Sequence, residues 1–383
     1  MENKILYLDY MSTTPVDPRV VEVMQKSLSA DFGNASSQHA FGFQAKEKIE
    51  TARAQVAALI NADSKEIIFT SGATESINLA LKGAALFYQR QGKHIITMST
   101  EHKAGLDTCR YLESLGFEVT YLNPQKNGLL NLDDLKKAIR RDTILASIMH
   151  VNNETGVIQD IFSIGQCLRE NGILFHVDAA QSVGKIPIDL KNLPVDLMSL
   201  VSHKIYGPKG VGALYVRRQP RVQLIAQMHG GDQENKLRSG TLATHQMVGM
   251  GEAYVIAKNN LILESKRIAT LRDQFEKNMS ALSGIYFNGD RKNRVCGCSN
   301  FSIDNIDAPV LLEKINNRMA ISQGSACNAV DPEPSHVLVA MGLTRDVANR
   351  SFRVSFGRFM TEKDLQNVST YMIDEINQHR ARS

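Results

Sequence analysis

Short apolar runs alternate with amphipathic stretches over the first two thirds of the chain. Apolar residues recur at helical spacing over residues 43–60, and Asp17-Pro18 is a typical start for an earlier helix. The apolar runs between the amphipathic stretches are typical of buried strands. The predicted strands are residues 67–70, 94–98, 119–122, 144–151, 174–177 and 197–201. This alternation predicts a mainly parallel sheet covered by helices on both faces, an α/β fold.

The pattern changes near residue 260. Helical spacing predicts one long helix over residues 245–282, and shorter strands and helices follow it. The predicted elements are strands at 300–303, 320–322 and 352–356, with helices at 308–319, 335–341 and 361–378. These elements form an α+β unit that we expect to be a second domain.

The composition is that of an ordinary globular protein. Of its 383 residues, 43% are hydrophobic and 22% are charged, and the formal charge of +4 is spread along the chain. Basic clusters at 217–221 and 379–382 contain no aromatic residue, so we expect solvated surface there rather than direct nucleic-acid binding. The sequence shows neither a secretory signal nor an apolar run of membrane-spanning length, so we expect no membrane contact. A cytoplasmic protein, or the mature part of an organellar one, is expected.

The chain has five cysteines, an odd and scattered set that favours a reducing compartment over a disulfide framework. Cys109 and Cys167 lie in amphipathic helical patterns and are expected to be buried. Cys296-Gly-Cys298 has no second pair of zinc ligands at the right spacing, so we expect a structural role and no metal. Cys327 lies in a small, polar stretch that ends in prolines, which predicts an exposed loop. An exposed thiol on such a loop suits a nucleophile.

Candidate binding residues follow the predicted strands, since ligands of a doubly wound sheet bind beyond the carboxyl ends of its strands. After the first strand, residues 70–75 lead into a helix whose N-terminus could hold an anion, with Thr74 adding a hydroxyl. An ordinary capped helix start is the competing interpretation. His102 follows the second strand, and residues 152–156 follow the fourth. His102 is a candidate catalytic residue, with a structural histidine as the alternative. Residues 152–156 supply amide donors suited to a carboxylate, with a simple turn as the alternative.

Asp178 directly follows the fifth predicted strand, and Lys204 follows the sixth at the same edge of the sheet. A buried Asp is costly unless it meets a cation, a metal or a protonated ring. Pyridoxal phosphate needs this set: a lysine for its aldehyde, an acid for its ring nitrogen and a helix end for its phosphate. A structural ion pair and a nucleotide site remain alternatives. No G-x-G-x-x-G motif follows the first strand, and the SVGK run at 182–185 lacks the rest of a phosphate loop.

Eight motifs occur in order along the chain: SGATES at 71–76, TEHK at 100–103, HVNNE at 150–154, HVDA at 176–179, HKIYGPKG at 203–210, RSGT at 238–241, GSAC at 324–327 and FRVS at 352–355. Through these motifs the chain closely resembles, from Leu6 to about Phe359, the NifS/IscS-type cysteine desulfurases of the class V aminotransferase family. The resemblance implies a PLP-dependent transferase of fold type I. Its large PLP-binding α/β domain is expected at residues 15–260. Its small α+β domain, which carries the cysteine loop, is expected at residues 1–14 and 261–383.

The implied enzyme is a PLP-dependent cysteine desulfurase, a sulfurtransferase. It converts L-cysteine to L-alanine and keeps the sulfur on Cys327 as a persulfide. Sulfur-acceptor proteins then receive it, either an iron–sulfur scaffold or a sulfur carrier for tRNA thiolation. The resemblance also implies a homodimer. Housekeeping members carry a longer C-terminal tail that docks the scaffold, so docking of that kind is not implied for this chain.

Residue roles follow from the same resemblance. Lys204 is the Schiff-base lysine, His102 stacks on the cofactor ring and exchanges protons, and Cys327 is the sulfur acceptor. Asn153 and Arg353 hold the substrate carboxylate, for which a guanidinium has the right geometry. Asp178 holds the ring nitrogen, Gln181 the phenolic oxygen, and Thr74 and His203 the phosphate, while Thr241 comes from the other subunit. The full cofactor set is Ala73, Thr74, His102, Asp178, Gln181, Ser202, His203, Lys204 and Thr241.

Several positions depart from the family pattern. Val201 stands where a serine usually binds the phosphate, Ser202 stands where glycine is usual, and Gln323 replaces a small residue before the cysteine. The run at 230–236 is more polar than usual, and Met11-Ser12 replaces a smaller pair. These changes predict weaker phosphate binding. Two alternatives stay open: another class V activity, an aminotransferase or a lyase in which Cys327 would be dispensable, and a non-catalytic regulatory homologue.

Overall fold

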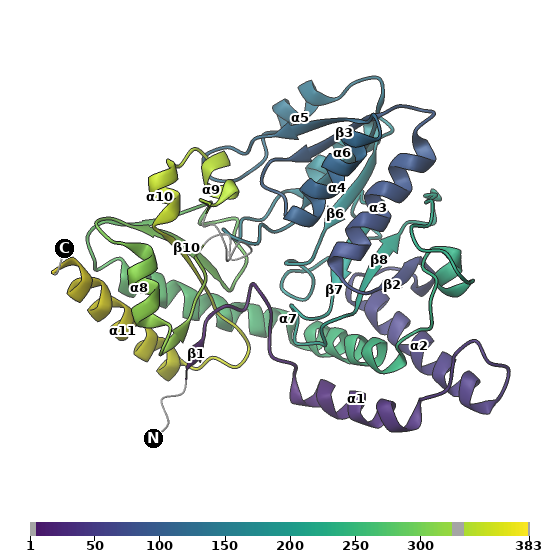
Figure 1. Cartoon of the computed structure of the whole chain (residues 1–383), viewed down its shortest axis with the longest axis horizontal. Helices are drawn as coiled ribbons and strands as arrows, with labels where there is room; N and C mark the ends of the chain where they lie inside the picture. The colour runs from purple at the N-terminus through teal and green to yellow at the C-terminus, as the bar shows by residue number, and fades with distance from the viewer. Residues whose placement is uncertain (1–4, 324–332, 382–383) are drawn as a thin grey trace.

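The structure is a computed structural model that describes residues 5–323 and 333–381. Figure 1 shows a larger part built around a long sheet and a smaller part, on the left of the view, that contains β10, α8 and α11. The segments that form the smaller part include both the first described strand and the last helix. Cys327 and its nearest neighbours lie outside the described residues.

Seven strands form the large sheet in the order β2-β8-β7-β6-β5-β3-β4. β8 runs antiparallel to both of its neighbours, and every other pairing is parallel, which confirms the predicted mainly parallel α/β fold. The carboxyl ends of β2, β3, β5, β6 and β7 therefore meet at one edge. The strands are β2 (Ile67–Thr70), β3 (His94–Met98), β4 (Glu118–Leu122), β5 (Thr143–Met149), β6 (Leu174–Asp178), β7 (Leu197–Val201) and β8 (Gly212–Val216).

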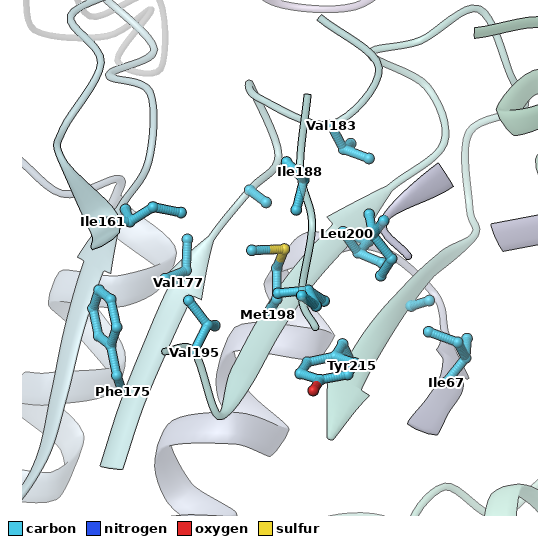
Figure 2. Close-up of a cluster of buried hydrophobic side chains, with 14 of the residues drawn as sticks. Ile67, Ile161, Phe175, Val177, Val183, Ile188, Val195, Met198, Leu200 and Tyr215 are labelled. Atoms are coloured by element: carbon cyan, nitrogen blue, oxygen red, sulfur yellow. The ribbon is translucent and has the colours of Figure 1, made fainter. Parts of the chain in front are cut away.

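Helices cover both faces of this sheet, because each face presents every second, apolar residue of the strands. Figure 2 shows one face, where Phe175 of β6, Met198 of β7 and Tyr215 of β8 are buried together. Burial of such a side chain contributes roughly 1.5–3 kcal/mol. α2 (Ala40–Leu59), α6 (Ile161–Glu170) and α7 (Thr244–Met279) cover this face, and α3 (Ala73–Tyr88) and α4 (Lys103–Ser114) cover the other. α1 (Pro18–Ala30) lies against α7, and α5 (Leu132–Ala138) lies near α6.

A separate core joins the two ends of the chain. Leu8 and Tyr10 are buried with Phe275, Phe301 and Phe352. The elements are β1 (Leu6–Tyr7), β9 (Ile285–Phe287), β10 (Cys298–Ile303), α8 (Ala308–Ile315), β11 (Met319–Ala320), α9 (His336–Ala340), α10 (Arg345–Asn349), β12 (Ser351–Ser355) and α11 (Glu362–Arg380). On this basis we propose the division into residues 15–260 and residues 1–14 with 261–383. Helix α7 crosses that boundary.

Pairing with other segments, one distant and one nearby in the sequence, explains two element ends that differ from the prediction. The helix predicted over 308–319 ends at Ile315, because Met319 and Ala320 form strand β11, which pairs in parallel with β1. The strand predicted over 144–151 ends at Met149. Val151 instead forms an isolated bridge with Ile158, which closes a short loop over residues 152–157 at the edge of the sheet.

Candidate active site

A cavity of about 390 Å³ opens at the edge where the carboxyl ends of the parallel strands meet. It brings together eight of the predicted site residues from five different strand ends. These are Ala73, Thr74, His102, Asn153, Asp178, Gln181, His203 and Lys204. Val201 also lines this cavity, whereas Ser202, Thr241 and Arg353 do not.

The N-terminus of α3 forms one wall of the cavity. Gly72 caps this helix at φ 156° and ψ 180°, a conformation that is essentially limited to glycine. A Cβ atom on Gly72 would meet no atom within 4 Å, so the space in front of the helix end is open. No side chain of the described residues caps the helix. The first N–H groups and the positive end of the helix dipole therefore suit a phosphate.

The loop before α3 is held from two sides. The hydroxyls of Thr70 and Ser76 lie 2.7 Å apart. Glu75 accepts a hydrogen bond from the Ser71 backbone N–H at 2.7 Å and forms an ion pair with Arg238 at 2.9 Å. These contacts keep the helix end open without filling it, so the anion site is preformed.

Asp178 lies at the end of β6, 7% exposed, and lines the cavity. Its Oδ1 accepts a hydrogen bond from the Ala180 backbone N–H at 2.9 Å, which fixes the carboxylate. A carboxylate this deeply buried is stable opposite a cation or a protonated ring nitrogen. The residue therefore fits the acid that a pyridoxal ring requires.

His102 is the N-cap of α4, and its Nδ1 accepts a hydrogen bond from the Ala104 backbone N–H at 3.1 Å. A neutral ring in this position carries its proton on Nε2. Burial lowers the pKa of His102, and the positive charge of Lys204 lowers it further. The ring is therefore neutral near pH 7 and has one defined tautomer.

Lys204 follows β7 in a segment that the N-terminal part of the chain fixes. Thr14 donates its backbone N–H and its hydroxyl to the His203 carbonyl, at 3.0 and 2.9 Å, and its hydroxyl accepts from the Tyr206 N–H at 2.8 Å. His203 Nδ1 lies 3.0 Å from the Thr13 hydroxyl. Burial, with Lys204 as a second cause, lowers the pKa of His203 to about 4, so this ring is neutral as well.

Asn153 and Arg353 meet at the boundary between the two cores. Arg353, in the middle of β12, donates from Nη1 to the Asn153 carbonyl at 2.7 Å. Its Nη2 donates to Asp9 and to the Ser12 hydroxyl, both at 2.6 Å. Among the described residues, Arg353 Nε and Asn153 Oδ1 are buried without a hydrogen-bond partner. The two residues predicted to hold a carboxylate thus lie together and retain unused polar atoms.

The remaining predicted residues lie away from this cavity or outside the described residues. Ser202 is fully buried, and its hydroxyl is packed so closely against Gly207 that a Cβ there would lie 2.0 Å from it. Thr241 is exposed on a loop before α7. The segment that contains Cys327 is not described. On its two sides, Ser322 pairs with the Arg353 backbone, and the Ser335 hydroxyl donates to Glu154. Both flanks therefore lie beside Asn153 and Arg353.

The sequence analysis did not single out Glu101, a buried carboxyl directly before His102. Its Oε1 accepts the Met149 backbone N–H at 3.0 Å, and its carbonyl oxygen lies 3.0 Å from His336 Nε2. Burial raises the pKa of Glu101 well above its ordinary value, and the charge of Asp178 adds to the rise. The carboxyl therefore keeps its proton in the folded state at pH values where an unfolded chain has lost it.

We expect Glu101→Gln to make the folding stability less sensitive to pH. Above about pH 4.3, the ordinary carboxyl pKa, the folded parent binds more protons than the unfolded chain, so its stability falls as the pH rises. Glutamine keeps the acceptor for Met149 but cannot ionise. Urea unfolding at about pH 5 and pH 8 should show the variant gaining free energy of unfolding, relative to the parent, as the pH rises.

Glu47→Gln serves as the matched control, because Glu47 is exposed on α2. It should shift the pH dependence little. A Glu101→Gln protein with the same pH dependence as the parent would show that Glu101 ionises freely in the fold.

These residues fit pyridoxal phosphate. The open end of α3 can hold its phosphate, the buried Asp178 its ring nitrogen and Lys204 its aldehyde. Within the described ranges, no group of three or more His, Cys, Asp or Glu side chains could hold a metal ion. Of the helices described, none is long and apolar enough to cross a membrane.

Comparison with known proteins identifies the family of the chain. The family model of the class V aminotransferases matches residues 6–368. A cysteine desulfurase IscS of Shewanella denitrificans is 55% identical over 97% of this chain and 94% of the relative, and one of Pectobacterium atrosepticum is 56% identical over 94% and 90%. Among solved structures, a NifS-like protein matches with a TM-score of 0.91 at 34% identity, covering 98% of this chain and 100% of the other.

A second solved structure, described as SspA in complex with cysteine, matches with a TM-score of 0.83 at 41% identity, covering 93% of this chain and 100% of the other. The similarity extends over both cores of the fold and over every strand end that lines the cavity. The resemblance seen in the sequence motifs is confirmed. The chain belongs to the class V aminotransferase family, the PLP-dependent group that contains the NifS/IscS-type cysteine desulfurases.

Proposed function

We propose that this chain is a pyridoxal-phosphate-dependent cysteine desulfurase, which converts L-cysteine to L-alanine and transfers the sulfur to Cys327. The observation that carries the proposal is the convergence on one cavity of an open helix N-terminus, a buried aspartate and a lysine. The Asn153–Arg353 pair lies directly beside them. The IscS relatives, and the related structure with bound cysteine, support the same activity.

Each residue has a role in holding the cofactor. The first turn of α3 with Thr74 and His203 would bind the phosphate, Asp178 the ring nitrogen and Gln181 the phenolic oxygen. Lys204 would attach the aldehyde covalently. When bound, the cofactor supplies an electron sink for the substrate carbon atoms. Neutral His102 lines the same cavity, with its only ring proton on Nε2, and can donate that proton in exchange with the substrate.

Arg353 and Asn153 would bind the substrate carboxylate as donors, Asn153 from its Nδ2 amide group and Arg353 from Nε, which has no competing partner among the described residues. The Cys327 thiolate then attacks the substrate sulfur. An S–S bond forms while the C–S bond breaks, and Lys204 and His102 return protons to the carbon atoms. One cysteine and one thiol thus give one alanine and one persulfide, with no external oxidant or reductant.

A second copy of the chain would complete the site in this proposal. Thr241 is exposed and does not reach the cavity of its own chain. Phe41 and Phe43 are 52% and 60% exposed. Phe43 lines a groove of about 1270 Å³ together with residues 231–235. The exposed Phe41 and Phe43 side chains suit burial against a second copy of the chain, and the groove itself is lined mainly by polar and charged residues. We further propose sulfur-acceptor proteins as partners. We also propose a cytoplasmic location, since the four described cysteines are free thiols, as a reducing compartment favours.

The direct test incubates the protein with pyridoxal phosphate and L-cysteine and measures alanine and sulfide. Alanine should form at one equivalent per sulfur released, and sulfide should need an added thiol for release from the enzyme. L-Serine, which has the same shape without sulfur, is the control and should give no alanine. A protein that binds the cofactor but consumes cysteine only with a 2-oxo acid would be an aminotransferase. A protein that does neither would be a non-catalytic homologue.

Val201→Ser is expected to hold the cofactor more tightly. Val201 lines the cavity at the end of β7 and is 2% exposed. Its side chain is apolar, so it offers the phosphate no hydrogen bond. A serine hydroxyl there adds one bond to a charged group, worth about 1.5–3 kcal/mol at most. Dialysis followed by absorbance of the retained cofactor measures the gain, and Val201→Ala controls for the smaller side chain. Equal loss from the serine and alanine variants would mean that the hydroxyl does not reach the phosphate.

A further inference from the structure

Lys185, which the sequence analysis noted only as the end of an incomplete phosphate loop, contacts a predicted cofactor residue. The chain turns back sharply after Asp178, with Lys185 and Ile186 both bonded to the Ser182 carbonyl. Gly184 adopts φ +70° in this turn, and a Cβ there would come within 3.0 Å of Ile205. As a result Lys185 Nζ, which is partly buried, donates a hydrogen bond of 2.7 Å to Gln181 Oε1.

The other end of the Gln181 amide is bonded as well. Its Nε2 donates to the Met11 carbonyl oxygen at 2.7 Å. A side-chain amide can be placed in two orientations, and its hydrogen-bond network decides between them. The Met11 carbonyl can only accept, so the amide nitrogen must face it, and the amine of Lys185 can donate to the amide oxygen at the other end in either protonation state. The amide oxygen faces Lys185, and the amide nitrogen faces Met11.

This orientation determines what Gln181 can offer the cavity that it lines. An amide nitrogen carries two hydrogens, and Met11 takes one of them, so one N–H remains for an acceptor. Gln181 is 2% exposed, and a buried amide oxygen without a donor would be costly. Without Lys185 the side chain would turn to find another donor. A cation on the oxygen also polarises the amide and strengthens its remaining N–H as a donor.

We propose that Lys185 is a positioning residue that keeps Gln181 as a hydrogen-bond donor to a negatively charged oxygen in the cavity. The inference rests on the proposed function, in which that oxygen is the phenolic oxygen of pyridoxal phosphate. Burial, followed by the charge of Lys204, lowers the pKa of Lys185 to about 7. Both forms of the amine carry N–H groups that can donate to Gln181. Burial costs the amine hydration free energy, and its hydrogen bond to the Gln181 amide offsets part of that cost.

A double-mutant cycle tests this role. Lys185→Met keeps the length of the side chain and removes the donor, Gln181→Leu removes the amide, and the double variant removes both. The readouts are the affinity for pyridoxal phosphate and the absorbance maximum of the bound cofactor. Lys185→Met should weaken binding by about 3- to 10-fold and shift the maximum. In the Gln181→Leu background the same change should have no further effect, because the residue that Lys185 orients is gone.

Additive losses of affinity in the cycle would overturn the proposal, since they would mean that Lys185 acts independently of Gln181. Lys185→Arg keeps a donor and should bind the cofactor within about 2-fold of the parent. If the methionine variant does not fold, the arginine variant tests the role in its place. A folded arginine variant that binds the cofactor weakly would overturn the role. A parent protein that binds no cofactor would refute the proposed function and this inference together. A parent that binds it and desulfurates cysteine, with an additive cycle, would refute the inference alone.

Discussion

Cys327→Ser is expected to bind L-cysteine and to change the absorbance of its cofactor on binding, while sulfide production falls by about 10³-fold or more. The residues proposed to bind cofactor and substrate, including Lys204, Asp178 and Arg353, do not depend on the thiol. Attack on the substrate sulfur requires a thiolate, which a serine hydroxyl cannot replace. Stopped-flow absorbance with cysteine measures binding, and a sulfide assay with added thiol measures turnover.

The four other cysteines provide the matched control. Cys109, Cys167 and Cys298 are buried and Cys296 is half-buried. Burial raises the pKa of all four thiols, that of Cys109 to about 12. These thiols stay protonated and are poor nucleophiles near pH 7. A variant that lacks all four should retain most of its turnover if it folds. Loss of turnover in that folded variant, with activity kept in Cys327→Ser, would assign the sulfur to a different thiol.

Lys204→Ala is expected to lose the covalent link to the cofactor, the absorbance that the link produces, and nearly all turnover, by about 10³-fold or more. The fold should survive, because Thr14 holds this segment through backbone atoms of His203 and Tyr206, which the substitution leaves in place. Absorbance of the purified protein and reduction of the link with borohydride, followed by mass determination, measure attachment.

Lys209→Ala is the control for this variant. Lys209 also lines the cavity, but it is exposed and lies beyond the Tyr206 turn. It should keep the covalent link. Unchanged attachment in Lys204→Ala, with attachment lost in Lys209→Ala, would assign the covalent link to Lys209, five positions further along the chain. That result would contradict the pairing of the cofactor lysine with Asp178.

Local patterns predicted most of the large sheet, because its strands are buried on both faces and appear as plain apolar runs. The predicted strands at 67–70, 94–98 and 197–201 agree with β2, β3 and β7. β8 was not predicted, although Gly212–Val216 is itself a short apolar run. The pairing of β1 with β11 joins the two ends of the chain, and no window of local sequence contains such a contact.

Local sequence patterns likewise predicted one part of the candidate site and missed another. The rule that ligands bind beyond strand ends found His102, Asp178 and Lys204, since each lies at the end of a buried strand or within four residues after it. Arg353 lies in the middle of β12, where the pattern gives no functional signal, so only the family resemblance indicated it. Ser202 follows Val201 directly, and successive side chains of an extended chain point in opposite directions. Val201 therefore lines the cavity, while Ser202 packs against Gly207.

Glu101 and Lys185 show what sequence reasoning lacked. Each lies beside a residue that the sequence analysis did predict, yet its importance depends on burial and on one hydrogen-bond partner from another segment or turn. Charge and spacing along the chain do not reveal either property. Contacts of this kind become visible only once the turn after Asp178 and the end of β5 are placed in space.

The most direct measurement of the central claim locates the transferred sulfur. The parent protein, loaded with pyridoxal phosphate, is incubated with L-cysteine in the absence of other thiols, alkylated, digested and analysed by mass spectrometry. The account predicts one additional sulfur atom on the peptide that contains Cys327, together with one equivalent of alanine. Additional sulfur on Cys109, Cys167, Cys296 or Cys298 with Cys327 unmodified, or alanine formed with no sulfur on the protein, would contradict it.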